Sequence, residues 1–177
     1  DDTIARGTPG RELMFRAGKA IFESVPWKTP VGIVCGSGNN AGDGYVLAGL
    51  LHEAGIACEL ILLSDRFSED GAGYFAQCRD AGVPIVSGCP PLSLSRYATV
   101  VDCIFGTGFH GTMQGKVLEA VRAINSCGAF VVSVDINSGL NGDSGLADEC
   151  VRSDLTVSVG CFQPGHFLNM AKDMMKE

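Results

Sequence analysis

Short apolar runs alternate with amphipathic stretches along most of the chain of 177 residues. Helices are predicted over residues 10–24, 43–54, 68–81 and 115–126. In the first of them, the apolar residues recur at the spacing of one helix face: Leu13, Met14, Ala17, Ala20 and Ile21. The predicted strands lie at residues 31–35, 58–63, 84–86, 99–105, 130–135 and 155–160. This alternation favours an α/β fold with a mostly parallel central sheet.

Proline and glycine mark several element ends. Pro9 stands directly before the first predicted helix, and Gly55 and Gly82 follow two others, where C-terminal caps are common. The segment 88–96 is rich in proline and serine and is predicted to be a loop. No linker is long enough to divide the chain, so residues 1–177 are predicted to form a single domain.

Composition and charge narrow the classes of partner. With 46% hydrophobic and 19% charged residues, the chain has the composition of a folded protein. Its formal net charge is −7 and it has no basic run, which argues against nucleic acid or an anionic membrane as a partner. A run of roughly 18 apolar residues, as a membrane span needs, is absent from the sequence. No secretory signal peptide is visible, so we expect a cytoplasmic protein, or a mitochondrial one if the source is eukaryotic.

The chain has eight cysteines and no CxxC pair. Because several stand inside apolar runs, we interpret them as small buried side chains of a protein in a reducing compartment. Without paired ligands they do not indicate a zinc site.

The first predicted strand leads into the glycine-rich sequence GSGNNAGDG at 36–44 and then into a helix. Glycines let a ligand approach the backbone, and a helix N-terminus offers free N–H groups to an anion. Gly36, Gly38 and Ala41 match a dinucleotide fingerprint, and Asp65 stands where a ribose-binding acid is expected. By this motif alone, the chain is a dehydrogenase candidate.

Three polar residues do not suit a plain pyrophosphate loop. Asp43 is interpreted as a helix cap, and Asn39 and Asn40 as left-handed turn residues, if their roles are structural. Alternatively, an asparagine oxygen binds a cation or a sugar hydroxyl while backbone amides hold phosphate.

Two carboxylates occupy apolar strands. Asp102 interrupts the run TVVDCIF and needs either a cation or strong donors, for which the following GTG turn is one source. In the loop 106–111, His110 is interpreted as a solvated residue, with a catalytic role as the alternative. Asp135 ends the run FVVSVD, at the sheet edge where parallel α/β folds bind ligands. The residues 141–144, NGDS, are predicted to form a surface turn.

Four polar residues therefore stand at or just past strand ends: Asn40, Asp102, Asp135 and Ser138. All offer oxygen ligands, which favours a hard cation but does not choose between potassium, sodium and magnesium. Asp135 is the preferred acid/base candidate, because a carboxylate at a partly buried strand end can have a tuned pKa.

The motifs GNNAGDG, DCIFGTGFHG, SVDINSGLNGDSG and SDLTVSVGCFQPG, preceded by GTPGRELMFRAGKA, resemble in order the YjeF N-terminal domain family. The resemblance implies a Rossmann-like three-layer α/β/α sandwich, usually dimeric. It also implies an NAD(P)H-hydrate epimerase, which interconverts the R and S forms of hydrated NADH or NADPH at C6. An ADP- or ATP-dependent NAD(P)H-hydrate dehydratase, in some proteins fused to the epimerase, would be the functional partner.

The resemblance also assigns residues. Asp135 would be catalytic, and potassium would be bound by Asn40, Asp102 and Ser138. Substrate would contact Asp135 and two stretches of the chain: Asn39, Asn40, Ala41, Gly42 and Asp43 in the first, and Gly106, Thr107, Gly108, Phe109, His110, Gly111 and Thr112 in the second.

Four departures from the family pattern affect these expectations. Ala41 replaces a common glycine, at a cost that depends on the sign of φ, and Asn137 replaces a proline, which is expected to loosen the backbone near Ser138. His110 stands where some relatives have lysine, and the N-terminal arm, which bears on dimer contacts, is short.

Two other functions remain as alternatives. A non-catalytic domain of this type, which serves as a dimerising scaffold in mRNA-decapping enhancers, is disfavoured by the retained Asn40, Asp102 and Asp135. An NAD(P)-dependent oxidoreductase would require a substrate domain beyond the 177 residues.

Overall fold

The computed structural model describes residues 7–87 and 93–177. Its strands form one six-stranded sheet in the order β3-β2-β1-β4-β5-β6, and all five strand pairings are parallel. The strands are β1 (Val31–Cys35), β2 (Cys58–Leu62), β3 (Ile85–Ser87), β4 (Thr99–Cys103), β5 (Phe130–Val134) and β6 (Leu155–Val157). The prediction of an α/β fold is confirmed, and the sheet predicted to be mostly parallel is parallel throughout.

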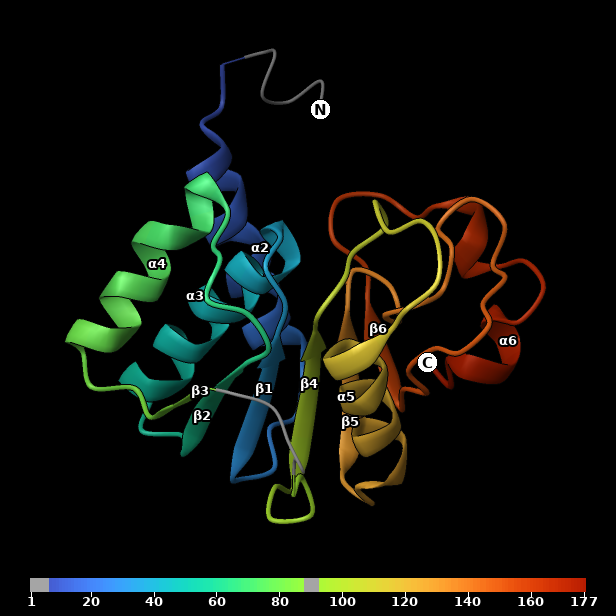
Figure 1. Cartoon of the computed structure of the whole chain (residues 1–177). Coiled ribbons are helices and arrows are strands. Elements are labelled where there is room, and N and C mark those ends of the chain that lie inside the picture. The colour runs from blue at the N-terminus through green and yellow to red at the C-terminus, as the bar shows by residue number, and fades with distance from the viewer. Residues whose placement is uncertain (1–6, 88–92) are drawn as a thin grey trace.

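Helices cover both faces of the sheet (Figure 1). The four long helices are α2 (Gly10–Ser24), α3 (Asn39–Glu53), α4 (Glu69–Asp80) and α5 (Gly115–Ser126). Helices α2, α3 and α4 pack together on one face, and α5 lies on the other. The short helices η1 (Pro164–His166) and α6 (Ala171–Met174) follow the last strand. The predicted three-layer α/β/α sandwich is therefore confirmed.

Successive strand residues point to opposite faces and divide the core in two. In β1, Ile33 packs toward α3 while Val34 packs toward α5, and in β4, Val101 and Val100 divide in the same way. All four side chains are fully buried. Both sheet faces are thus covered, which explains why the strands read as continuous apolar runs.

The strand order reverses direction between β1 and β4, because the chain builds outward from β1 to β3 and then returns to start the other half. The loops that leave these two neighbouring strands diverge and open a crevice at the carboxyl edge of the sheet. Polar residues that follow β1 and β4 line this crevice, among them Asn40 and Thr107.

The largest difference from the predicted elements concerns α3, which was expected over 43–54 and begins at Asn39. The residues Asn39 to Asp43 are therefore helical, and positive φ angles among the described non-glycine residues occur at Asp135 and Asn169. The interpretation of Asn39 and Asn40 as left-handed turn residues is wrong. The interpretation of Asp43 as the cap is also wrong, since Gly38 is the N-cap and no side chain caps the helix.

Other element ends shift by one to three residues. The helix over 10–24, the strand over 31–35 and the helix over 115–126 have the predicted bounds. Strands predicted over 99–105 and 155–160 stop at Cys103 and Val157, because the chain leaves the sheet there to form loops. Helix α4 starts one residue later than predicted, since the Ser68 hydroxyl caps it by accepting from the Gly71 amide at 3.2 Å. In the predicted loop over 88–96, residues 88–92 lie outside the described ones, and 93–96 are neither helix nor strand.

The described cysteines are all free, and most are buried. Cys161 is exposed and Cys127 is half-buried, so the expectation of buried cysteines is wrong for Cys161; Cys89 lies outside the described residues. Among the described helices, none combines the length and apolar character that crossing a membrane requires.

Candidate functional site

A cavity of about 630 Å³ opens at the carboxyl edge of the sheet, between the loops that follow β1 and β4. The start of α3 forms one wall, the loop after β4 forms the opposite wall, and Asp135 stands at the end of β5. The lining residues are Ser37, Gly38, Asn39, Asn40, Asp43, Ile104, Phe105, Gly106, Thr107, Gly108, Phe109, His110, Asp135 and Val159.

Most of the residues that the family resemblance assigned to substrate line this one cavity. Nine do so: Asn39, Asn40, Asp43, Gly106, Thr107, Gly108, Phe109, His110 and Asp135. Four do not. Ala41 and Gly42 are buried on the other side of α3, where Gly42 abuts Met14, while Gly111 and Thr112 line smaller neighbouring cavities. Ala41 has a helical rather than a positive φ, so alanine fits there without backbone strain.

The backbone of Asp135 is held in the left-handed region, with φ of 68°. Its N–H donates to the Val157 carbonyl at 2.8 Å, and its carboxylate Oδ2 accepts from the Thr107 amide at 2.8 Å. A Cβ atom on Gly106 would lie 2.6 Å from the same oxygen, so glycine at 106 lets the loop approach the carboxylate. The left-handed backbone and the Thr107 contact together fix the carboxylate at the cavity wall.

His166 is a site residue that the sequence did not single out. Its Nε2 lies 2.7 Å from the Asp135 carbonyl oxygen, and its Nδ1 accepts from the Gln163 amide at 3.0 Å. Since Nδ1 is the acceptor, Nε2 carries the hydrogen and donates it to Asp135. His166 is buried and comes from η1, 31 residues further along the chain. Pro164 and Gly165 before it indicate a turn, but they do not indicate that this turn lies next to Asp135.

Asp43 projects into the same cavity from α3. It is 9% exposed, and its burial, together with the nearby Asp135 carboxylate, raises its pKa from 3.8 to about 8. Two carboxyl groups thus face one cavity in different settings, because the Thr107 amide donates to Asp135, whereas no described residue donates a hydrogen bond to the Asp43 carboxyl group.

A cluster of buried oxygens lies beneath the cavity. The Asp102 carboxylate accepts from the Ser138 hydroxyl at 2.6 Å, the Ser138 amide at 2.9 Å and the Ser133 hydroxyl at 3.0 Å. The Ile104 amide also donates to it, at 3.2 Å. These donors replace the predicted GTG turn as the source of its hydrogen bonds. They oppose the effect of burial, which nevertheless raises the pKa of Asp102 above its usual value.

Asn40 completes this cluster from α3. Its amide nitrogen donates to the carbonyls of Phe105, at 2.8 Å, and Val134, at 3.2 Å. Its Oδ1 is buried without a hydrogen-bond partner among the described residues. A buried carboxylate with neutral donors and an unpaired amide oxygen are features that a bound cation would satisfy. By the chemistry of their donors, Asn40, Asp102 and Ser138 therefore fit a hard cation such as the potassium ion that the resemblance implies.

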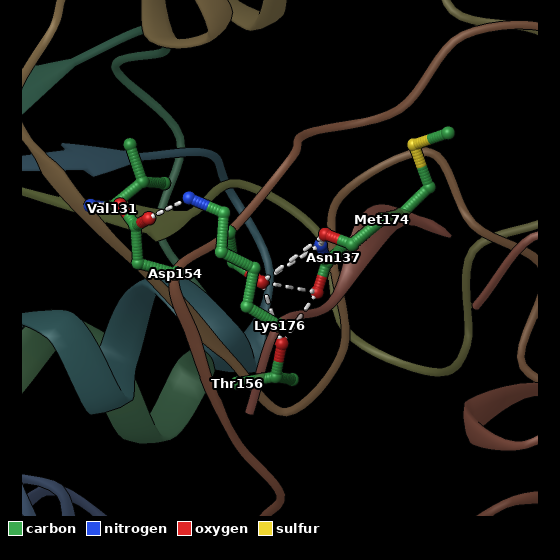
Figure 2. A network of polar contacts seen from close by, with 7 residues as sticks. Val131, Asn137, Asp154, Thr156, Met174 and Lys176 are labelled. Carbon is green, nitrogen blue, oxygen red and sulfur yellow. Dashed lines mark hydrogen bonds and ion pairs between the residues drawn. The ribbon is translucent and has the colours of Figure 1, made fainter. Parts of the chain in front are cut away.

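The Asn137 side chain is held by several hydrogen bonds. Its amide nitrogen donates to the carbonyls of Val151, at 2.8 Å, and Met174, at 2.9 Å, and its Oδ1 accepts from the Thr156 hydroxyl at 2.7 Å. Figure 2 shows the bonds of Asn137 to Thr156 and to Met174, the second of which joins the loop after β5 to the C-terminal segment. The expectation that Asn137 loosens the backbone near Ser138 is contradicted, since its buried side chain makes the cross-links that a proline lacks.

The mouth of the cavity carries His110 and Phe109. His110 is exposed, and its Nδ1 lies 3.2 Å from the amide nitrogen of Asn141. Phe109 stacks on Phe105 with ring centroids 4.3 Å apart. The predicted surface turn is present, since Asn141 Oδ1 accepts from the Asp143 and Ser144 amides, although Gly142 is buried.

Several lining residues carried no sequence signal. Ile104, Phe105 and Val159 look like strand residues, and they reach the cavity because β4 and β6 end earlier than predicted. Asp65, the acid required by the dehydrogenase interpretation, lines a different cavity beside β2.

The strand order and the cavity at its reversal define a Rossmann-like α/β domain with a ligand site at the sheet edge. The chain belongs to the family described as YjeF-related protein N-terminus, which matches residues 10–165.

Named relatives cover most of the chain. It is 36% identical over 168 residues to an NAD(P)H-hydrate epimerase of Oenococcus oeni, covering 90% of this chain and 79% of that protein. It is 39% identical over 156 residues to the bifunctional NAD(P)H-hydrate repair enzyme Nnr of Archaeoglobus fulgidus, covering 86% of this chain. The chain spans 33% of the length of that bifunctional enzyme. The crystal structure of yeast ynu0 shares the fold, with a TM-score of 0.79 at 23% identity, covering 96% of this chain and 78% of that one.

Proposed function

We propose that the protein is an NAD(P)H-hydrate epimerase, which interconverts the R and S forms of hydrated NADH and NADPH. The observation that carries this proposal is the Asp135 carboxylate, fixed at the wall of the cavity by the Thr107 amide and by its own left-handed backbone. Relatives that are 33% and 36% identical to the chain are named for this activity.

The cavity suits a nucleotide substrate. The N-terminus of α3 follows Gly38 at the cavity wall, where backbone N–H groups favour a phosphate. The loop from Gly106 to His110 supplies further backbone next to Asp135, with the Phe109 ring for a flat group. In this arrangement Asp135 acts on the reacting end of the substrate, moving a proton as the C6 hydroxyl leaves and returns or as the ring opens and closes.

We further propose that potassium is the ion of the site, held by Asn40, Asp102 and Ser138. When bound, the ion supplies positive charge beneath the cavity. The unpaired Asn40 Oδ1 and the buried Asp102 support this assignment. Asn40 itself donates to the loop after β4 and to the end of β5, and so fixes the start of α3 relative to both.

The epimerase would work with an NAD(P)H-hydrate dehydratase that acts on the S form. The relatives named bifunctional NAD(P)H-hydrate repair enzyme are longer proteins, and the chain covers 33% of the length of each, which supports a fused or separate dehydratase as the partner here. A homodimer and a cytoplasmic or mitochondrial location are parts of the same proposal, and the formal net charge of −7 supports the absence of nucleic acid as a partner.

A direct test follows the ratio of the two epimers. Purified S-form hydrate is mixed with the protein, and proton NMR records the approach to the R:S equilibrium. The proposal expects relaxation proportional to protein concentration and faster than in buffer. A relaxation rate that equals the spontaneous rate at every protein concentration leaves the non-catalytic scaffold as the better interpretation.

A further inference from the structure

Asp43 is the carboxyl group of the cavity that the proposed function has not yet used in chemistry. It projects from α3 into the cavity that Asp135 lines and is 9% exposed. No hydrogen bond or ion pair within the described part of the chain reaches its carboxyl group. A polar group so buried and aimed at a ligand cavity, without a donor from the protein, is positioned for a partner on the ligand.

The surroundings of Asp43 favour its protonated form. The titratable residues that line the cavity with it are Asp135 and His110, and Cys103 of β4 packs below it against Gly44. Burial first, and then the Asp135 carboxylate, raise the pKa of Asp43 to about 8. Asp135 differs, because the Thr107 amide donates a hydrogen bond to its carboxylate.

Two carboxyl groups with different environments in one cavity are the arrangement that separates a proton donor from a proton acceptor. We propose that Asp43 is a second catalytic residue, which donates a proton to the leaving C6 hydroxyl while Asp135 accepts a proton from the returning water. This inference rests on the proposed epimerase function and adds the chemical route.

The step balances without a redox partner. The C6–O bond breaks with its electron pair going to oxygen, Asp43 supplies the proton, and the product is water. The ring nitrogen pair forms a C6=N1 double bond, which leaves a cationic iminium. Water then adds to C6 from the opposite face, the π pair returns to nitrogen, and Asp135 takes the proton. The enzyme ends with Asp43 charged and Asp135 protonated, and exchange with solvent restores the starting state.

The first test is the variant Asp43→Asn, which keeps the size of the side chain and removes its acid. General acid catalysis contributes a factor of roughly 100 to 10,000, so kcat should fall at least about 100-fold, with a smaller change in KM. Asp173→Asn is the matched control, because Asp173 is exposed on α6, and its kcat should equal that of the wild type. A wild-type kcat in Asp43→Asn overturns the inference.

The second test uses the wild-type protein and does not depend on a variant that folds. In water enriched in oxygen-18, each conversion should place a solvent oxygen on C6, and kcat/KM should decline above about pH 8 as Asp43 ionises. Retention of the original oxygen, or a flat profile through this range, overturns the route. If the wild type does not accelerate epimerisation at all, the proposed function itself fails, so the two failures are distinguishable.

Discussion

Asp135 is held from three sides: by Val157 through its N–H, by Thr107 through its carboxylate, and by His166 through its carbonyl. Replacing Asp135 with asparagine keeps the shape and removes the proton acceptor. We expect kcat to fall by roughly 100-fold or more, with the thermal midpoint nearly unchanged. Steady-state kinetics and a melting curve check this. An Asp135→Asn protein with wild-type kcat would remove Asp135 from acid/base chemistry.

His166 is a positioning residue, because it acts on the site through the Asp135 backbone. We expect His166→Ala to lower kcat about 10- to 100-fold, since small displacements of a catalytic group are costly, with little change in KM. His166→Gln retains a side-chain N–H that can reach the Asp135 carbonyl and should recover most of kcat. If both variants lose stability equally but keep the wild-type kcat in their folded fraction, His166 has a structural role alone.

Asp43 also links stability to pH. Its pKa is about 8 in the folded protein and returns toward 3.8 when the chain unfolds. Between these values the folded protein binds more protons, so the contribution of Asp43 is fully present below about pH 4 and is lost as pH rises through about 8. The free energy of unfolding of Asp43→Asn should therefore exceed that of wild type by at least about 1 kcal/mol at pH 8. Near pH 4 the two free energies should differ little. Urea denaturation across this pH range, with Asp173→Asn as control, measures the difference. The prediction is contradicted if the free energies of unfolding of wild type and Asp43→Asn differ by the same amount at every pH.

The C-terminal segment is held against the edge of the sheet by a hydrogen bond from the Asn137 amide to the Met174 carbonyl. Loss of its side chain would leave the Thr156 hydroxyl and the Met174 carbonyl without these partners (Figure 2). We expect Asn137→Ala to lower the free energy of unfolding by about 2 to 4 kcal/mol. Lys176→Ala breaks the neighbouring surface pair with Asp154 and should cost less than about 1 kcal/mol. Equal losses in the two variants, measured by urea denaturation, would contradict this account.

The elements themselves were largely predictable, because apolar runs and helical spacing are local signals. The start of α3 was not, since the glycine and asparagine run from Gly36 resembles a loop although residues from Asn39 onward are helical. That difference matters, because it buries Ala41 and Gly42 in the helix packing and turns Asp43 toward the cavity.

The candidate site was predictable to the extent that its residues stand at strand ends. Asp102 and Asp135 interrupt or end apolar runs, and a parallel sheet brings such positions to one edge. The contact of His166 with Asp135 joins residues 31 positions apart through an irregular segment, and the Asn137 network likewise depends on the path of the C-terminal segment. No local pattern encodes either arrangement.

If potassium binds to the folded protein, the thermal stability of the whole molecule should depend on which cation is present. A ligand that binds the folded state alone stabilises it in proportion to the logarithm of its concentration. Replacing potassium with lithium at equal ionic strength should lower the thermal midpoint by a few degrees. Asn40→Ala should abolish the difference, and Asn39→Ala, an exposed neighbour, should retain it. An identical midpoint in both salts for the wild type would contradict the potassium site.

If the cavity at the sheet edge epimerises hydrated nicotinamide nucleotides, the protein should convert the R form into substrate for an S-specific dehydratase. The most direct measurement mixes freshly prepared R-form hydrate with an excess of an S-specific dehydratase and follows the recovery of NADH as the protein is added. We expect NADH recovery to rise in proportion to the protein concentration and to fall toward the spontaneous rate with Asp135→Asn. Recovery no faster than the spontaneous rate at any protein concentration would contradict it.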